Sequence, residues 1–237
     1  MKLILSFILS FTFIFSKAVA LNSANNGVKL KNQADDSSSY SVIYKMGTLG
    51  FGVDFEYMFN STLGVRANFN GFSYRVNGVA LGDNEYSFEG DLASSGLLVD
   101  YHPWQNAFRF SGGVYNHKSS ITGVVKPTSG EVTVGDKTYP SMQIGSIDTK
   151  IDFNHINPYM GFGFSSASKS GWHFMADIGA LYIGTPKAKL TAKAAKGFEG
   201  LQYILDDQAK IEEDKINNTL EKYNWYPVLS VGVQFKY

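Results

Sequence analysis

The chain of 237 residues contains no cysteine, which excludes a disulfide framework and a lipoprotein anchored through a cysteine after its signal peptide. Beyond its first residues, the sequence has no uninterrupted apolar stretch near the roughly 20 residues that a transmembrane helix needs. Basic and acidic side chains are equal in number, at 21 each, so no charge excess indicates nucleic acid as a partner. Any association with a membrane must therefore use strands or a surface helix.

The first twenty residues (1–20) have the pattern of a cleaved secretory signal peptide. Lys2 is followed by an apolar run over 3–15 and then by Ala18-Val19-Ala20, which is an A-x-A cleavage pattern. The alternative is an N-terminal membrane anchor, but the run is short for a span of about 20 residues. Cleavage removes two of the 21 basic residues, Lys2 and Lys17, and no acid, which leaves 19 basic and 21 acidic residues.

Aromatic residues and glycines are abundant, at 15% of the chain and 24 residues. A polar segment at 21–39 is predicted to be a flexible lead-in. After it, apolar residues alternate with small or polar ones in eight segments, as expected of strands. These segments are 40–46, 49–59, 63–74, 86–102, 108–115, 151–164, 172–182 and 225–237. The pattern predicts an all-β fold, an eight-stranded antiparallel up-and-down transmembrane β-barrel over 40–237.

The connections between these segments alternate in length. The short ones are 60–62, 103–106 and 167–171, and the long ones are 77–84, 119–149 and 185–224. Outer-membrane barrels are built in this way, with short periplasmic turns and long outer loops. One exception is a tight turn at Gly47-Thr48, which falls on the outer side. Helix-forming residues at 199–222, with Asp206 and Lys210 as a favourable i,i+4 pair, predict a helical insert before the last strand.

The stretch GFGVDFEYMFN at 50–60 raises the question of which strand face points inward. Phe51 and Phe55 lie on one face, and Asp54 and Glu56 lie on the other beside glycines. The interior of an eight-stranded barrel is just wide enough for side chains to fill it, so it cannot take every aromatic ring of the strands. Glycine weakens a water-exposed strand but suits a crowded interior. We therefore predict that the aromatics face lipid and that the carboxylates face the lumen.

Charged side chains are predicted to form a network inside the barrel. Its members are Glu56, Arg66, Asp100, Arg109, Asp54 and Asp177. The two short turns place Glu56 opposite Arg66 and Asp100 opposite Arg109. Because an unpaired charge in a dry interior is costly, pairing is close to obligatory, and the network is expected to plug the lumen. The alternative is a pair of solvated salt bridges on a protein surface.

The three tryptophans lie near strand ends. Trp104 and Trp172 are at short turns, and Trp225 opens the last strand. Such positions suit the aromatic girdles that sit at the two interfaces of a membrane barrel. The alternative is ordinary packing in a core or a turn.

The last segment, WYPVLSVGVQFKY, alternates regularly and ends with Phe235 and Tyr237. It resembles the C-terminal signal by which the barrel assembly machinery recognises outer-membrane proteins. The hairpins GFGVDFEYMFNSTLGVRANFNGFSY, LLVDYHPWQNAFRFSGGVY and NPYMGFGFSSASKSGWHFMADIGALY resemble units of small Gram-negative barrels of the OmpA-like or opacity-type porin family. The resemblance implies a place in the cell outer membrane among its lipids and lipopolysaccharide. We expect a monomer. The resemblance does not specify an activity.

Three functions stay open at this point. The first is a structural or surface-interaction role, in which the outer loops contact a host, a phage or lipopolysaccharide. The second is a narrow channel for small or hydrophobic solutes, gated by the Glu56/Arg66 and Asp100/Arg109 pairs. The third is a lipid A-modifying enzyme, but the spacing of the histidines requires neither a triad nor a metal site. The histidines are His102, His117, His155 and His173. We favour the first role and predict no catalytic residue, metal or cofactor.

Overall fold

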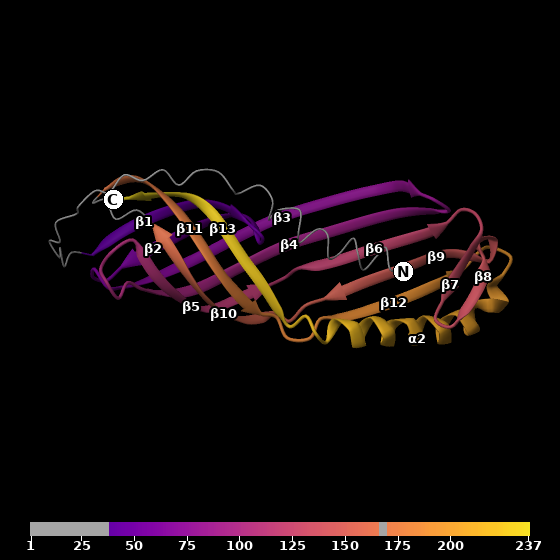
Figure 1. Cartoon of the computed structure of the whole chain (residues 1–237). Coiled ribbons are helices and arrows are strands. Elements are labelled where there is room, and N and C mark those ends of the chain that lie inside the picture. The colour runs from indigo at the N-terminus through magenta and orange to yellow at the C-terminus, as the bar shows by residue number, and fades with distance from the viewer. Residues whose placement is uncertain (1–37, 166–169) are drawn as a thin grey trace.

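The computed structural model describes residues 38–165 and 170–237 (Figure 1). The predicted signal peptide at 1–20 lies outside these residues, as do residues 21–37 of the predicted lead-in and most of the predicted turn at 167–171. The described part is mainly strand, arranged in one 11-stranded sheet and one 2-stranded hairpin. Among the described residues, no helix has both the length and the apolar character needed to cross a membrane.

Eight strands of the large sheet close into an antiparallel barrel, at the left of Figure 1. In chain order they are β1 (Ser39–Gly47), β2 (Gly50–Met58), β3 (Leu63–Leu81), β4 (Asn84–Tyr101), β5 (Phe108–His117), β10 (Ile156–Ser165), β11 (Gly171–Tyr182) and β13 (Trp225–Lys236). Each strand pairs with the next in this order, and β13 returns to β1. The predicted eight-stranded up-and-down barrel is confirmed, including the tight turn between β1 and β2.

The barrel strands direct most of their large apolar side chains outward and their charged side chains inward. Phe51 on β2 is 60% exposed, and Phe55 and Phe69 are exposed beside it. Asp54 on β2 and Arg66 on β3 point the other way and are buried. Since a soluble barrel would show the reverse arrangement, the predicted assignment of the two faces is confirmed.

The predicted long loops are corrected by the structure, because residues 77–84 and 119–149 are mostly strand and residues 187–194 of the predicted connection 185–224 are also strand. β3 and β4 continue beyond the barrel and stay paired up to a tight turn at Gly82-Asp83. Beside them lie β6 (Ser120–Pro127), β9 (Ile144–Asp152) and β12 (Lys187–Ala194), in the order β3-β4-β6-β9-β12. We call these three strands, together with β3 from residue 72 onward and β4 up to residue 92, the extension sheet. A separate hairpin of β7 (Glu131–Val134) and β8 (Lys137–Pro140) is followed by the 3-10 helix η2 (Ser141–Gln143).

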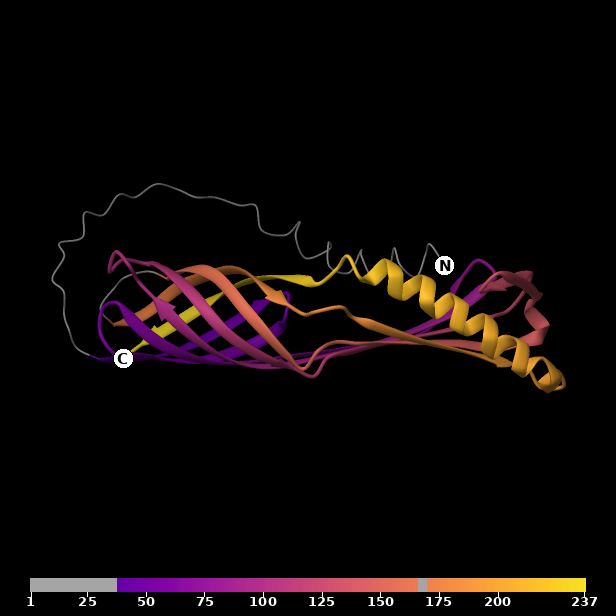
Figure 2. The same ribbon diagram turned by 90° about the horizontal axis from the view of Figure 1, so that it is seen from below.

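The predicted helical insert at 199–222 is confirmed as the 3-10 helix η3 (Glu199–Leu201) followed by α2 (Gln202–Leu220). Figure 2 shows α2 running along the edge of the extension sheet, beside β12. Its side chains bond the free backbone edge of that strand. Asn217 bonds both the N–H and the carbonyl of Ala188, and Glu213 accepts from the N–H of Leu190 at 2.9 Å. The helix thus protects an edge strand that would otherwise be open to pairing with other chains.

The two faces of β4 exchange polarity where the strand leaves the barrel. On the inward side, the barrel part of β4 carries Asp100, Leu98 and Ser94, whereas the part beyond the barrel carries Leu92, Phe88 and Tyr86. On the outward side, the barrel part carries Tyr101, Val99 and Leu97, whereas the part beyond the barrel carries Asp91, Glu89, Ser87 and Glu85. The exchange falls between two adjacent levels of the β3–β4 ladder, Asn70–Ser94 and Phe72–Leu92. The extension sheet therefore has the pattern of a water-facing sheet with one apolar face.

Candidate functional site

A buried charge cluster crosses the barrel interior and is centred on Arg66 from β3. Its Nη1 lies 3.2 Å from Asp54 Oδ2 and 2.9 Å from Asp177 Oδ2, and its Nε lies 2.8 Å from Asp100 Oδ2. Its Nη2 donates to Ser111 Oγ at 3.2 Å. The Arg66 side chain is 1% exposed. One planar guanidinium thus bridges carboxylates from β2, β4 and β11, a geometry that the fork of donors on arginine permits.

Two further cations complete the cluster. Arg109 Nη2 lies 2.7 Å from Asp177 Oδ1, and Arg109 Nε lies 3.9 Å from Asp100 Oδ1. Lys45 Nζ lies 2.9 Å from Asp54 Oδ2. Lys45 is absent from the predicted network, although its place on the inward side of β1 could have indicated it. Lys45, Arg66 and Arg109 therefore balance the charges of Asp54, Asp100 and Asp177.

Two predicted contacts of the network are corrected. Glu56 does lie opposite Arg66 in the ladder, but its carboxylate accepts a hydrogen bond from Gln234 Nε2 at 2.6 Å. Asp100 lies opposite Ser111 rather than Arg109. The reason is a shift of two residues along β5, because Tyr101 pairs with Phe110 and not with Phe108. Asp100 still accepts a hydrogen bond from Ser111, so the shift replaces its direct cross-strand partner without leaving it unpaired.

An apolar layer lies next to the charge cluster, toward the end of the barrel that carries the extension sheet. Tyr115 and Tyr159 meet edge to face with ring centroids 5.4 Å apart. Gly96 makes room for this layer, since a Cβ there would lie 2.9 Å from the Tyr115 ring. The buried members of the layer are Leu49, Leu98, Tyr115, Tyr159, Leu181, Ile183 and Val228. The lumen is therefore filled at two successive levels, one charged and one apolar.

The predicted interfacial and C-terminal aromatics lie on the outside of the barrel. Trp172 meets Phe235 with ring centroids 5.1 Å apart, and Trp225 meets Tyr182 at 5.2 Å. Trp104 packs near Phe108 and Phe110. The β11–β13 register puts Trp172 and Trp225 at opposite ends of that strand pair, and Phe235 and Tyr237 share the end of Trp172. Their roles at membrane interfaces and in assembly stay predictions.

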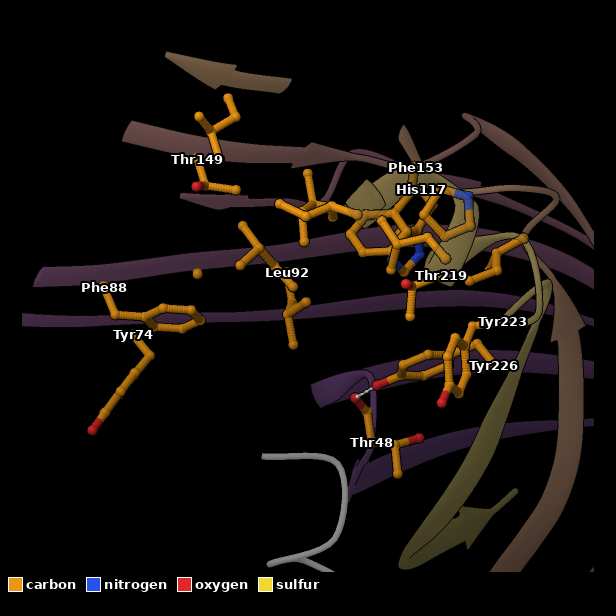
Figure 3. Close-up of a pocket in the computed structure, with 18 of the residues that line it drawn as sticks. Thr48, Tyr74, Phe88, Leu92, His117, Thr149, Phe153, Thr219, Tyr223 and Tyr226 are labelled. Carbon is orange, nitrogen blue, oxygen red and sulfur yellow. Dashed lines mark hydrogen bonds between the residues drawn. The ribbon is translucent and has the colours of Figure 1, made fainter. Parts of the chain in front are cut away.

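A groove of about 750 Å³ opens between the extension sheet, α2 and the rim of the barrel. Figure 3 shows Phe88 and Leu92 of β4, Thr219 of α2 and Tyr226 of β13 around it. Tyr226 Oη donates to the carbonyl of Thr48 at 2.7 Å and so ties β13 to the β1–β2 turn. The lining is mostly apolar. The groove is not predicted from the sequence, because its lining combines predicted strands, the helical insert and part of the predicted loop at 119–149, which only the fold brings together.

Few polar groups lie in the lining of the groove. Glu212 on α2 is 3% exposed, and burial raises the pKa of its carboxyl, against the smaller effect of nearby Lys215. His117 meets the Phe153 ring edge to face at 6.3 Å. Within the described residues, Glu212 Oε1 and His117 Nδ1 have no hydrogen-bond partner. Buried polar atoms without hydrogen-bond partners are uncommon, so these two atoms distinguish the groove from an ordinary apolar cavity.

The hydrogen bonds of the histidine side chains within residues 38–165 and 170–237 are to backbone carbonyls. His102 Nδ1 bonds the carbonyl of Asn106, and His155 Nδ1 bonds the carbonyl of His117. Ser119, close to His117 in sequence, accepts from the N–H of Ala93. No histidine in this part of the chain bonds a serine hydroxyl or a carboxylate, and no group of three metal-ligating side chains occurs there.

Comparison with known proteins identifies relatives of the fold. No family model matches the sequence, and no curated protein matches it significantly. The structure is similar to the crystal structure of Acinetobacter baumannii CarO2, at 24% identity and a TM-score of 0.57, over 87% of this chain and 100% of that chain. It is also similar to A. baumannii CarO, at 22% identity and a TM-score of 0.55, over 83% of this chain and 97% of that chain. Similarity at this level of identity concerns the fold alone.

Proposed function

We propose that this chain is a Gram-negative outer-membrane protein with a structural and surface-interaction role. The barrel anchors it in lipid, its lumen is closed, and the extension sheet with α2 stands outside the cell as the interacting part. The exchange of polarity along β4 is the observation that carries this proposal. A strand surface in hydrocarbon must be apolar, whereas one in water is best polar.

The charge cluster favours this role over a narrow channel. Arg66 and Arg109 are fully buried among carboxylates, and the apolar layer with Tyr115 follows directly. A solute on this path must displace both layers. Buried ion pairs are costly to separate, because each charge is then left without its partner. The closed lumen therefore leaves the exposed extension sheet as the interacting part of the molecule.

The absence of native cysteine allows a direct test of orientation. Thr191→Cys lies on the exposed face of β12, and Ser61→Cys lies in the short turn between β2 and β3. In intact cells of a Gram-negative host, a membrane-impermeant maleimide is expected to label Thr191→Cys and to leave Ser61→Cys unlabelled. Permeabilisation should then expose Ser61→Cys. The two positions are a matched pair, because both lie in water and they are at opposite ends of the barrel.

The reverse labelling pattern, or equal labelling of both positions in intact cells, contradicts the proposed orientation. Membrane fractionation provides an independent control. The full chain should stay with the outer membrane and migrate anomalously on gels until it is boiled. Release into the soluble periplasm would overturn the membrane anchor itself.

A further inference from the structure

The groove exists because the apolar face of the extension sheet is only partly covered. α2 packs against β12 at the edge of the sheet, whereas Phe88 and Leu92 of β4 face the open space of about 750 Å³. Apolar surface left in water is unfavourable in proportion to its area. Apolar cavities of roughly 300–1,000 Å³ with a few polar groups are the usual form of small-molecule sites. This geometry points to a ligand site and not merely to loose packing.

The groove is long in one direction. Its lining on α2 extends from Glu212 to Leu220. Leu220 follows Glu212 by eight positions, which corresponds to roughly 12 Å along the helix axis at about 1.5 Å per residue. It then continues past Tyr223 to Thr48 at the barrel rim. Such a shape suits one extended alkyl chain better than a compact ring system.

Glu212 is the acidic residue of the groove lining, and it shares its one basic neighbour there, Lys215, with Asp136. The other charged lining residue is Lys215, whose Nζ lies 2.6 Å from Asp136 Oδ1 and also donates to the carbonyl of Gly135 at 3.0 Å. Lys215 Nζ is 3.8 Å from Glu212 Oε2, which is too far for a hydrogen bond. Glu212 Oε1 has no donor among the described residues. A ligand that donates a hydrogen bond, and carries positive charge, complements this position.

We propose that the groove binds a single-chain amphiphile, with its apolar chain along α2 and β4 and a cationic, hydrogen-bond-donating head group at Glu212. This inference rests on the proposed surface-interaction role, for which it names the class of ligand. A head group that carries a carboxylate is disfavoured, because it would meet Glu212 as a like charge or as a second acceptor.

Trp225 lies in the groove lining and provides a direct reporter. The chain has three tryptophans, so Trp104→Phe with Trp172→Phe leaves Trp225 alone. This full-length protein in phospholipid nanodiscs is titrated with a terminally brominated undecyl ammonium, whose bromine quenches tryptophan fluorescence. The carboxylate of the same chain length is titrated in parallel. We expect saturable quenching by the ammonium probe at a concentration roughly tenfold below that of the carboxylate probe.

Two variants in that background separate groove binding from partition into lipid. Gly90→Leu fills the groove from β4, where an added Cβ has only a 3.7 Å contact with the Phe88 ring. It should raise the half-quenching concentration at least tenfold. Glu212→Gln should weaken the ammonium probe roughly tenfold and remove its advantage over the carboxylate. Heat-modifiable gel migration verifies that each variant is folded.

Equal quenching in Gly90→Leu and its parent would show partition into lipid and overturn the proposal. Equal affinity for the two head groups in the parent protein would overturn the role of Glu212. Neither result changes the expected maleimide labelling of Thr191→Cys and Ser61→Cys. Failure of this inference is therefore distinguishable from failure of the proposed function.

Discussion

Replacement of Arg66 by alanine is expected to destabilise the barrel by about 3–5 kcal/mol. The substitution removes the cation that Asp54, Asp100 and Asp177 share, at distances between 2.8 and 3.2 Å. Removing one partner of a buried ion pair leaves a charge without compensation in a medium of low dielectric. Urea unfolding of the refolded barrel, followed by tryptophan fluorescence, measures this loss as a lower midpoint.

Arg75→Ala is the matched control for this prediction. Arg75 lies on the same strand and also forms an ion pair, with Glu89, but both side chains are exposed. Exposed pairs contribute about 0–1 kcal/mol, so the midpoint should stay close to that of the wild type. Arg66→Lys should fall between, because one ammonium cannot bridge three carboxylates as a guanidinium does. If Arg66→Ala and Arg75→Ala unfold at the same urea concentration, the charge cluster does not stabilise the fold.

A single methyl group at position 163 is expected to have the second-largest effect. A Cβ on Gly163 of β10 would lie 2.1 Å from Asp177 Oδ1 and 2.9 Å from Arg109 Nε. Asp177 cannot move freely, since it is held by both Arg66 and Arg109. Overpacking a rigid interior costs about 1–3 kcal/mol, and a weakened buried ion pair adds to that. We expect Gly163→Ala to lose about 3 kcal/mol in the same urea assay.

Gly123→Ala distinguishes this clash from the general effect of alanine in a strand. Gly123 lies on β6 of the extension sheet, and a Cβ there would have no neighbour within 4 Å. Substitution at such a position changes stability by at most about 0.5 kcal/mol. A Gly163→Ala protein as stable as Gly123→Ala would mean that the interior beside Asp177 is less tightly packed than the structure shows.

Much of the barrel could be predicted from the sequence, because lipid imposes a strict pattern on its strands. Each must alternate with a period of two and keep an apolar outer face, so Phe51, Phe55 and Phe69 mark the outside directly. The same parity places Asp54 and Arg66 inside. The helix before the last strand was also predictable, since its residues lack the alternation of strands and favour helix.

The register and the extension sheet could not be predicted in the same way. A shift of two residues in β5 preserves the inward and outward faces, so the pattern does not distinguish Ser111 from Arg109 as the partner of Asp100. The strands β6, β9 and β12 lie outside the apolar belt and carry polar residues on one face, which resembles loop composition. The groove, with Glu212 and His117 in its lining, depends on contacts between these distant segments.

The conductance of the wild-type barrel in a planar lipid bilayer measures directly whether the lumen is closed. With Arg66 bridging three carboxylates and the Tyr115 layer next to it, the lumen is filled by side chains. We expect no steady single-channel steps from correctly folded protein, under conditions in which a general porin inserted in parallel conducts. Reproducible single-channel steps from the wild-type protein would contradict a closed lumen and favour the narrow channel instead.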